Sequence, residues 1–418
     1  MKLNIRLLST VASALTLTAA TLPALAQETP AEVIHWMTTP SESAALKIAV
    51  DQFEKEGGKW IDTGISPSTT AKQVEIQRVT TGDPPEAIML VSKIDAMQLL
   101  EGGFLGDVRD VAEADGWSSL LPASAMDVIS HEGQVYAVPF EFQMTNIVWY
   151  NIEVLKSVGI ETAPQTWDEM IAALEAVQQK GNGIIPFANQ SEDSAWRNTF
   201  NFAFAAKGGP ELYNAVYRDR SVDAIKSPEF RAMAEAFKSL KAFTDPGAPA
   251  RKWNESMDMV ATGAAAMNFI GTWGKGPLLQ AKLEPGVDFG CSVLGGAPII
   301  NSAMFVFPKL DDPKRQESQR HLARVFMNPE VQSGFAAIKG GLPTNSKADT
   351  SAFDFCSQNF VKTLADGPEK AVLDAQLYMD TDTMAQLVDL AVQYWNDSLT
   401  IDQFVDQFAT VVPKALVF

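Results

Sequence analysis

Hydrophobic and polar positions along the chain alternate between the period of a strand and the period of a helix. The apolar run over 33–36 is typical of a strand, and the apolar positions over 46–53 have helical spacing that Gly57 ends. Further strand patterns, with helical patterns between them, occur at 87–91, 146–150, 184–188, 264–270, 289–294 and 303–308. Strands that alternate with helices predict an α/β architecture with mainly parallel sheets.

Helix boundaries are also marked in the sequence. Thr166 and Glu169 have the spacing of a capping box, and Gly181 ends the apolar helical pattern that follows them. From about Ser318 onward the pattern is mostly helical, and it finishes with one amphipathic face over 401–412.

The first 26 residues have the composition of a secretory signal peptide. Lys2 and Arg6 precede an uncharged apolar run over 7–20, and Ala24 and Ala26 form the small-x-small pattern of a cleavage site. We therefore predict export and cleavage after Ala26. An uncleaved anchor is the alternative, although the run is shorter than the roughly 20 residues of a membrane span.

Composition narrows the function classes. The 418 residues are 46% hydrophobic and 20% charged, which is typical of globular protein. Lys+Arg 33 against Asp+Glu 51 gives a net charge of −18, which repels phosphate and argues against a nucleic-acid partner. With three histidines, two cysteines and no nucleophile-elbow, phosphate-loop or dinucleotide-binding motif, the sequence predicts no metal and no cofactor.

The two cysteines are a candidate pair. An exported protein matures in an oxidising compartment, so we expect Cys291 and Cys356 to form a disulfide. Two buried free thiols are the alternative.

Three tryptophans stand apart from the helical apolar patterns. Trp36, Trp196 and Trp273 lie near strand ends or in glycine-rich and polar segments. A flat indole ring packs well against the C–H face of a sugar, and neighbouring carboxylates, amides and lysines can bind its hydroxyl groups. For each ring the alternative is core packing, but together with export the three favour a carbohydrate site.

Several motifs then occur in the order found in one protein family. They are the segments 35–42, 81–87, 133–139, 149–151, 164–169, 263–273 and 328–343. The segment 263–273 matches the pattern G-x-A-A-M-x-x-x-G-x-W, whose tryptophan stacks on the sugar in these proteins. On these motifs, which extend over some 300 residues, the chain resembles the periplasmic solute-binding proteins of bacterial ABC sugar importers, nearest the glucose/mannose type.

The resemblance implies two discontinuous α/β lobes that close over a ligand cleft. It implies a first lobe of residues 27–140 plus 297–348 and a second lobe of 141–296 plus 349–418. It further implies a carbohydrate ligand, an ABC permease in the inner membrane as partner, a periplasmic location and a monomer without cofactor.

The resemblance also implies which residues bind the sugar. By local alignment the ligand-binding residues are Trp36, Glu42, Ser92 and Lys93 from the first lobe, Gln143, Asn146, Trp196, Thr272 and Trp273 from the second, and Lys339 near the last crossing. Lys93 and Lys339 fit a surface role equally well.

The sequence departs from the glucose type at this site. Thr272 replaces a carboxylate, and the segment 140–144 lacks a histidine and a cation of the glucose pattern. A buried carboxylate discriminates strongly between ligands, so we expect weak glucose binding and favour a disaccharide, a polyol, or an acidic sugar at Lys93 or Lys339. The alternative from another class is a secreted carbohydrate-active enzyme that uses paired carboxylates.

Overall fold

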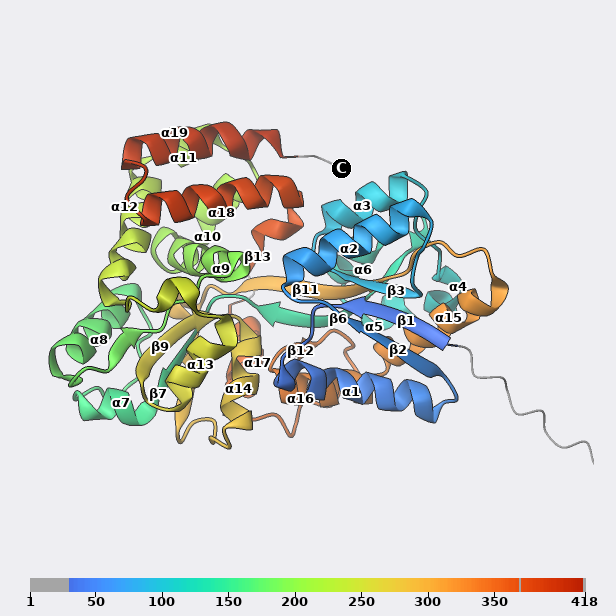
Figure 1. The fold of residues 1–418 in the computed structure, drawn as a ribbon, viewed down its shortest axis with the longest axis horizontal. Helices are drawn as coiled ribbons and strands as arrows, with labels where there is room; N and C mark the ends of the chain where they lie inside the picture. Colours follow the sequence, from blue (N-terminus) through green and yellow to red (C-terminus); the bar gives the residue numbers. More distant parts are fainter. Residues whose placement is uncertain (1–29, 368–369, 416–418) are drawn as a thin grey trace, which may run out of the picture.

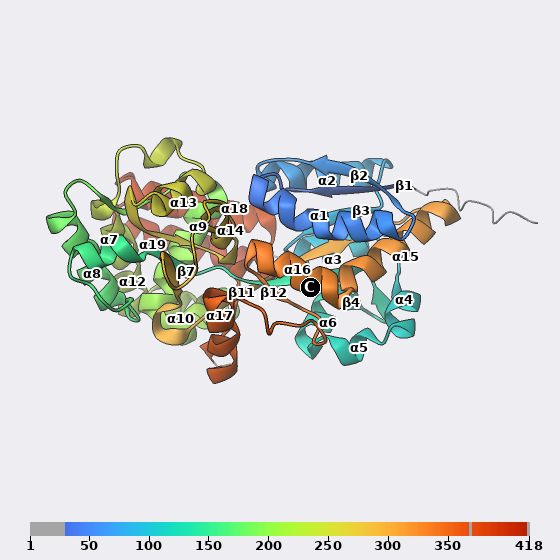
Figure 2. The ribbon, with the colours of Figure 1, turned by 90° about the horizontal axis from the view of Figure 1, so that it is seen from below.

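The chain folds into two lobes that lie side by side (Figures 1 and 2). The computed structural model describes residues 30–367 and 370–415, so the predicted signal peptide lies outside the described residues. Among those residues, none of the helices combines the length and the apolar character needed to cross a bilayer.

The first lobe is built on the larger sheet. Its strand order is β12-β6-β11-β3-β1-β2, and β13 pairs with β11. These strands are β1 (Pro30–His35), β2 (Lys59–Gly64), β3 (Ala87–Leu90), β6 (Ala137–Met144), β11 (Ile299–Val306), β12 (Leu342–Pro343) and β13 (Val372–Leu373). The lobe also contains the short hairpin of β4 (Ser130–His131) and β5 (Gln134–Val135) and the helices α1 (Pro40–Lys55), α2 (Ser68–Thr81), α3 (Lys93–Glu101), α4 (Arg109–Ala114), α5 (Trp117–Leu120), α6 (Ala123–Ile129), α15 (Pro313–Met327) and α16 (Pro329–Lys339).

The second lobe has a smaller sheet and more helix. Its strand order is β10-β7-β9-β8. These strands are β7 (Ile147–Asn151), β8 (Ile185–Phe187), β9 (Ala265–Ile270) and β10 (Phe289–Ser292). Its helices are α7 (Ile152–Ser157), α8 (Trp167–Lys180), α9 (Asp193–Ala203), α10 (Gly209–Tyr217), α11 (Val222–Ile225), α12 (Pro228–Ser239), α13 (Trp253–Ala261), α14 (Lys275–Gln280), α17 (Phe355–Asp366), α18 (Thr381–Trp395) and α19 (Ile401–Val411).

Local signals in the sequence are confirmed where they were strongest. The α8 helix begins with the predicted capping box, in which Glu169 N–H donates to Thr166 Oγ1 at 3.2 Å, and it ends at Gly181. All the predicted strand segments contain strands, and α19 carries the predicted apolar face, with Phe404, Val405 and Phe408 buried.

The prediction of mainly parallel sheets is wrong. Four strand pairings are parallel and six are antiparallel among the described residues. One reason is the passage of the chain between the lobes: β6 starts in the core of the first lobe and ends beside that of the second, and β11 makes the return. Two neighbouring strands that cross in opposite directions must pair antiparallel. In the second lobe, β7 also pairs antiparallel with both of its neighbours, β9 and β10. The residue boundaries expected for the lobes stay a prediction.

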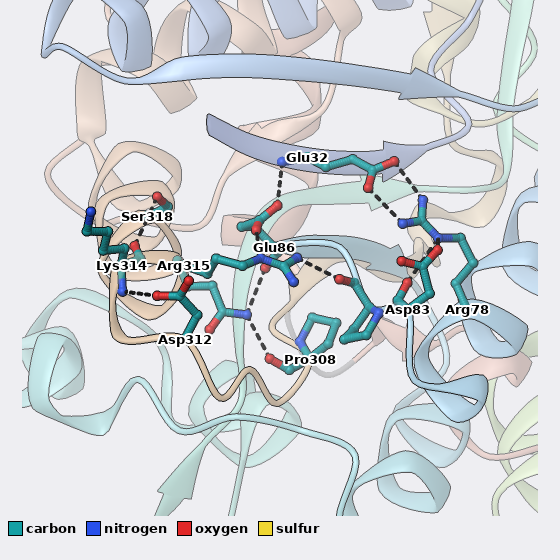
Figure 3. Close-up of polar contacts among 11 residues, drawn as sticks. Glu32, Arg78, Asp83, Glu86, Pro308, Asp312, Lys314, Arg315 and Ser318 are labelled. Atoms are coloured by element: carbon teal, nitrogen blue, oxygen red, sulfur yellow. Dashed lines mark hydrogen bonds and ion pairs between the residues drawn. The ribbon is translucent and has the colours of Figure 1, made fainter. Parts of the chain in front are cut away.

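The turn at 81–87, one of the family-like motifs, is a structural clamp in the first lobe (Figure 3). The carboxylate of Glu86 accepts hydrogen bonds from Glu32 N–H at 2.6 Å and from Arg315 Nε at 2.5 Å. Arg315 also donates to the carbonyl of Pro84, and Arg78 binds both carboxylate oxygens of Glu32 at 2.6 and 2.8 Å. Through its hydrogen bonds Arg78 holds the pKa of Glu32 below its usual range. The motif therefore ties β1, α2 and α15 to the turn that precedes β3.

The cysteines join two elements of the second lobe. Cys291 in β10 and Cys356 in α17 form a disulfide, with 5.9 Å between their Cα atoms and 65 positions between them in sequence. This distance lies in the ordinary range for the bond. The disulfide fastens the helix that follows the last crossing to the sheet of the second lobe.

The first lobe also buries Glu75, a glutamate that has no cationic side chain within hydrogen-bonding distance among the described residues. Glu75 on α2 is fully buried, and its Oε1 accepts a hydrogen bond from Met89 N–H at 3.1 Å, while Oε2 has no partner within the described residues. Burial raises the pKa of Glu75 to about 8, against the opposing effects of the Met89 hydrogen bond and the Lys72 charge.

We expect the double variant C291S/C356S to lower the free energy of unfolding by about 4 kcal/mol, because the open chain regains the entropy of a long loop. Urea unfolding of the oxidised wild type and the variant measures the difference. Thiol titration of unfolded, unreduced wild type should find no free thiol. Two reactive thiols would contradict the bridge.

We expect Glu75→Gln to remove a pH dependence of stability. The folded-state pKa of about 8 lies above the unfolded value of 4.5, so the folded protein binds one more proton between these values and stability falls as pH rises. Between pH 5 and pH 8 the wild type should lose roughly 3 kcal/mol that the variant retains. Urea unfolding at both pH values measures this loss, with Glu54→Gln at an exposed position of α1 as the control. Equal pH slopes for all three proteins would refute the assignment.

Candidate functional site

A pocket opens between the two lobes and takes its lining from both. Residues after β1, on α1, α2 and β6 face residues on α9, α13 and α18 across it. Of the ten predicted site residues, six line the pocket: Trp36, Glu42, Ser92, Gln143, Trp273 and Lys339. Further lining residues include Thr38, Thr39, Ser68, Thr69, Lys72, Glu192, Arg197, Trp253, Asn301, Gln376, Met379 and Thr381. Aromatic rings and hydrogen-bonding groups thus converge in one cleft.

Trp273 is held by a tight turn in which glycine is required. A Cβ on Gly271 would lie 2.1 Å from the Trp273 ring, so the indole folds directly over the backbone of Gly271. Below the turn, Trp149 Nε1–H donates to the carbonyl of Gly271 at 3.0 Å. A Cβ on Gly274 would meet the same Trp149 ring at 2.6 Å. Gly271 and Gly274 therefore let the backbone pass between two indole rings, and the contact with Trp149 holds the turn that carries Trp273.

Glu42 has a structural role and also lines the pocket. It forms a capping box at the start of α1, where Thr39 N–H and Thr39 Oγ1 donate to its carboxylate at 3.3 and 2.8 Å. The side chain is 7% exposed, and this burial raises the pKa of Glu42, while the nearby Lys339 charge opposes the rise. The carboxylate is thus fixed in orientation before any ligand arrives.

Lys339 lines the pocket at the place where the chain crosses between the lobes. Its ammonium group pairs with Glu141 of β6, and both side chains are at least 97% buried. Gln143 Nε2 donates to the same Glu141 oxygen at 2.5 Å. The charge of Lys339 is therefore matched by a carboxylate behind the pocket wall.

Four predicted residues do not line the pocket. Asn146 is buried between the strands, where it donates to the carbonyl of Ala297 and accepts from Ile299 N–H, both at 2.9 Å. Trp196 packs edge-to-face against Trp395 in the core of the second lobe, with 5.0 Å between the ring centroids.

The other two lie beside the pocket. Thr272 is completely buried, and its carbonyl faces Gly340, where a Cβ would lie 2.3 Å from it. Lys93 is the first residue of α3, after the N-cap Ser92, and is absent from the lining. At both positions a neighbour one residue away, Trp273 or Ser92, lines the pocket instead.

Trp253 is a pocket residue that sequence reasoning missed. It is the first residue of α13, and its N–H donates to Glu192 Oε2 at 3.0 Å. In the sequence it stands four positions before Met257, which is buried, so the spacing is that of an ordinary apolar helix face. Only the position of α13 beside the cleft distinguishes its role.

The side chains that could bind a metal ion are histidine, cysteine, aspartate and glutamate. Within residues 30–367 and 370–415, no group of three or more histidine, cysteine, aspartate or glutamate side chains is arranged to hold a metal ion.

We expect Lys339→Met to lower the free energy of unfolding by roughly 3–5 kcal/mol, because Glu141 then stays buried without its counter-charge. The double variant K339M/E141Q should be less destabilised than the single one. Urea unfolding measures both, with Lys47→Met at the exposed pair of Lys47 and Asp51 as a control that leaves stability nearly unchanged. A single variant as stable as the control would show that the pair is not buried.

Known proteins resemble the chain over nearly its full length. A "Probable sugar-binding periplasmic protein" of Brucella melitensis is 29% identical over 394 residues, which cover 92% of each chain. A protein of the same description from Rhizobium meliloti is 28% identical, over 98% of this chain and 99% of its own. Among solved structures, a chitin oligosaccharide binding protein superimposes with a TM-score of 0.79 at 20% identity, over 93% of this chain and 99% of its own.

A maltose-maltodextrin binding protein of Alicyclobacillus acidocaldarius also superimposes, with a TM-score of 0.70 at 17% identity, over 92% of this chain and all of its own. These likenesses show the two-lobed fold. The sequence profile of the bacterial extracellular solute-binding proteins matches residues 49–359, which is most of the chain. The chain therefore belongs to the bacterial extracellular solute-binding protein family.

Proposed function

We propose that this protein binds a neutral carbohydrate between its lobes and delivers it to an ABC importer. The observation that carries the proposal is the interlobe pocket, into which the first lobe contributes Trp36 and the second lobe contributes Trp253 and Trp273. Indole rings on both sides suit the two apolar faces of a pyranose ring, and lobe closure brings them together. The sugar-binding relatives and the family support the same conclusion.

The charges around the pocket favour a neutral ligand. Lys339 pairs with Glu141, and Lys72 lies 3.2 Å from the buried carboxylate of Asp95. Arg197 and Glu192 bring one charge of each sign to the start of α9. The carboxylate of a sugar acid would therefore meet no surplus positive charge from the two lysines, and it would lose hydration on entering the pocket.

This charge balance revises the expected ligand range. An acidic sugar was expected against Lys93 or Lys339, but Lys93 does not line the pocket and the charge of Lys339 is matched. The expectation of weak glucose binding rested on Thr272, which is buried beside the pocket, and on the segment 140–144, of which Gln143 lines the pocket; it stays a prediction. We therefore favour neutral sugars and polyols, from monosaccharide to oligosaccharide.

The proposal includes export to the periplasm and a monomeric state. The signal-peptide pattern supports cleavage after Ala26 and a periplasmic location, and the acidic composition argues against nucleic acid. A monomer suffices because both walls of the pocket come from one chain.

The alternative is a carbohydrate-active enzyme. Two carboxylates, Glu42 and Glu192, line the pocket, and the pKa of Glu42 is raised as in a general acid. However, both carboxylates already accept hydrogen bonds within the protein. Glu42 accepts from Thr39 in the capping box of α1, and Glu192 accepts from the backbone N–H of Trp253. Incubating the protein with sugars, followed by chromatography, distinguishes the two: products would favour the enzyme, and unchanged sugars the binding protein.

We expect a thermal-shift screen of the mature protein to give its largest shift with a neutral carbohydrate or polyol. A ligand present at one hundred times its dissociation constant adds about 2.7 kcal/mol to stability. Sugar acids matched to each neutral sugar serve as controls and should give smaller shifts. A sugar acid that gives the largest shift would overturn the charge argument, and no shift with any carbohydrate would overturn the proposed function.

We expect Trp273→Ala to weaken binding of the best sugar from that screen by about ten- to hundredfold, because one apolar platform is lost. Calorimetric titration measures the dissociation constant. Trp273→Phe is the matched control and should retain part of the affinity. An alanine variant that folds and binds like wild type would show that the ring does not contact the sugar.

A further inference from the structure

A polar cluster joins the two lobes on one side of the cleft. Asp95 on α3 and Lys72 on α2 belong to the first lobe, and Thr381 is the first residue of α18 in the second lobe. Thr381 Oγ1 donates to Asp95 Oδ2 at 2.5 Å, and Lys72 Nζ donates to Thr381 Oγ1 at 2.9 Å. Lys72 Nζ also lies 3.2 Å from Asp95 Oδ2. The three side chains form a closed set of hydrogen bonds across the interlobe gap.

The backbone adds to this contact. Thr381 N–H, which has no acceptor within its own helix, lies 3.4 Å from Asp95 Oδ1. The carboxylate of one lobe therefore faces the amino-terminal end of a helix of 15 residues in the other lobe, where negative charge is favoured. Asp95 is 3% exposed, so this contact is shielded from water.

The cluster is suited to repeated opening. Asp95 and Lys72 lie in the same lobe and can stay paired when the lobes separate, and the N-cap Ser92 Oγ keeps α3 in place through Asp95 N–H at 3.1 Å. Only Thr381 and the end of α18 leave, into water that can hydrogen-bond both. Closure thus adds hydrogen bonds to the existing ion pair of Asp95 and Lys72, and opening leaves neither of these two charges without its partner.

We propose that Asp95, Lys72 and Thr381 form a latch that stabilises the closed arrangement of the lobes without a ligand. Asp95 is a positioning residue, because it does not line the pocket, whereas Lys72 and Thr381 do. A hydrogen bond to a buried charged group shifts an equilibrium by about tenfold or more. The latch therefore populates the closed form before sugar binds and slows its opening afterwards.

Double electron–electron resonance on the full mature chain without added sugar tests the latch. Spin labels are attached at Thr80→Cys on α2 and Asp389→Cys on α18, two exposed positions, while the native cysteines stay in their disulfide. The latch predicts a closed, short-distance population in the wild-type background.

In this background, Asp95→Asn and Thr381→Val should each lower the ratio of closed to open molecules by about tenfold. The variant with both changes should lose little more than either single one, because the two side chains form one contact. Asp402→Asn is the matched control: it removes a carboxylate that pairs with Arg231 at 2.6 Å within the second lobe, and it should leave the distances unchanged.

Absence of a closed population in the wild type, or equal ratios in the wild type and both variants, would overturn the latch. If Asp95→Asn does not fold, Thr381→Val decides the question. Because no sugar is used, either outcome is independent of whether the proposed carbohydrate binding is correct.

Discussion

The antiparallel pairing of β6 with β11 is the constraint on which the remaining structure depends. These two strands carry the chain between the hydrophobic cores of the lobes in opposite directions, and Phe142 of β6 packs against both cores. The pairing shifts its register between Ala303 and Met304, which are opposite Glu141 and Pro139. A bulge bends a strand locally, so the crossing segment combines continuous hydrogen bonding with a place to bend.

Next to this bulge lies the buried pair of Glu141 and Lys339. Burying two charges is costly unless each is matched, so the pair sets the relative position of β6 and the end of α16 closely. The glycines after Lys339 allow close approach: a Cβ on Gly340 would meet the Thr272 carbonyl, and a Cβ on Gly341 would lie 2.2 Å from Glu141 Oε2. Since Lys339 lines the pocket and Thr272 adjoins Trp273, the crossing segment and the pocket wall share their contacts. The crossing strand and the pocket wall are thereby built from adjacent residues.

Much of the fold could be predicted because its signals are local. The capping box of Thr166 and Glu169, the apolar face of the last long helix and the strand runs each depend on residues that are neighbours in sequence. Strand direction could not be predicted in this way, since it depends on which strand returns beside which. The prediction of mainly parallel sheets failed at β6 and β11, the strands that connect the lobes, and also at β7, which pairs antiparallel with both β9 and β10.

For the site, the sequence by itself determined the tryptophan turn with its glycine and the cysteine pair, whereas the capping role of Glu42 came from the structure. Whether a side chain faces the cleft was decided only by the tertiary structure. Trp196 lies in a polar segment and Trp253 has the spacing of an apolar helix face, yet Trp196 packs on Trp395 in a core and Trp253 lines the pocket. Thr272 and Trp273 are adjacent and point to different surroundings. The physical reason is that pocket and latch are built from residues as far apart as Lys72 and Thr381, and nothing local in the chain encodes where such segments meet.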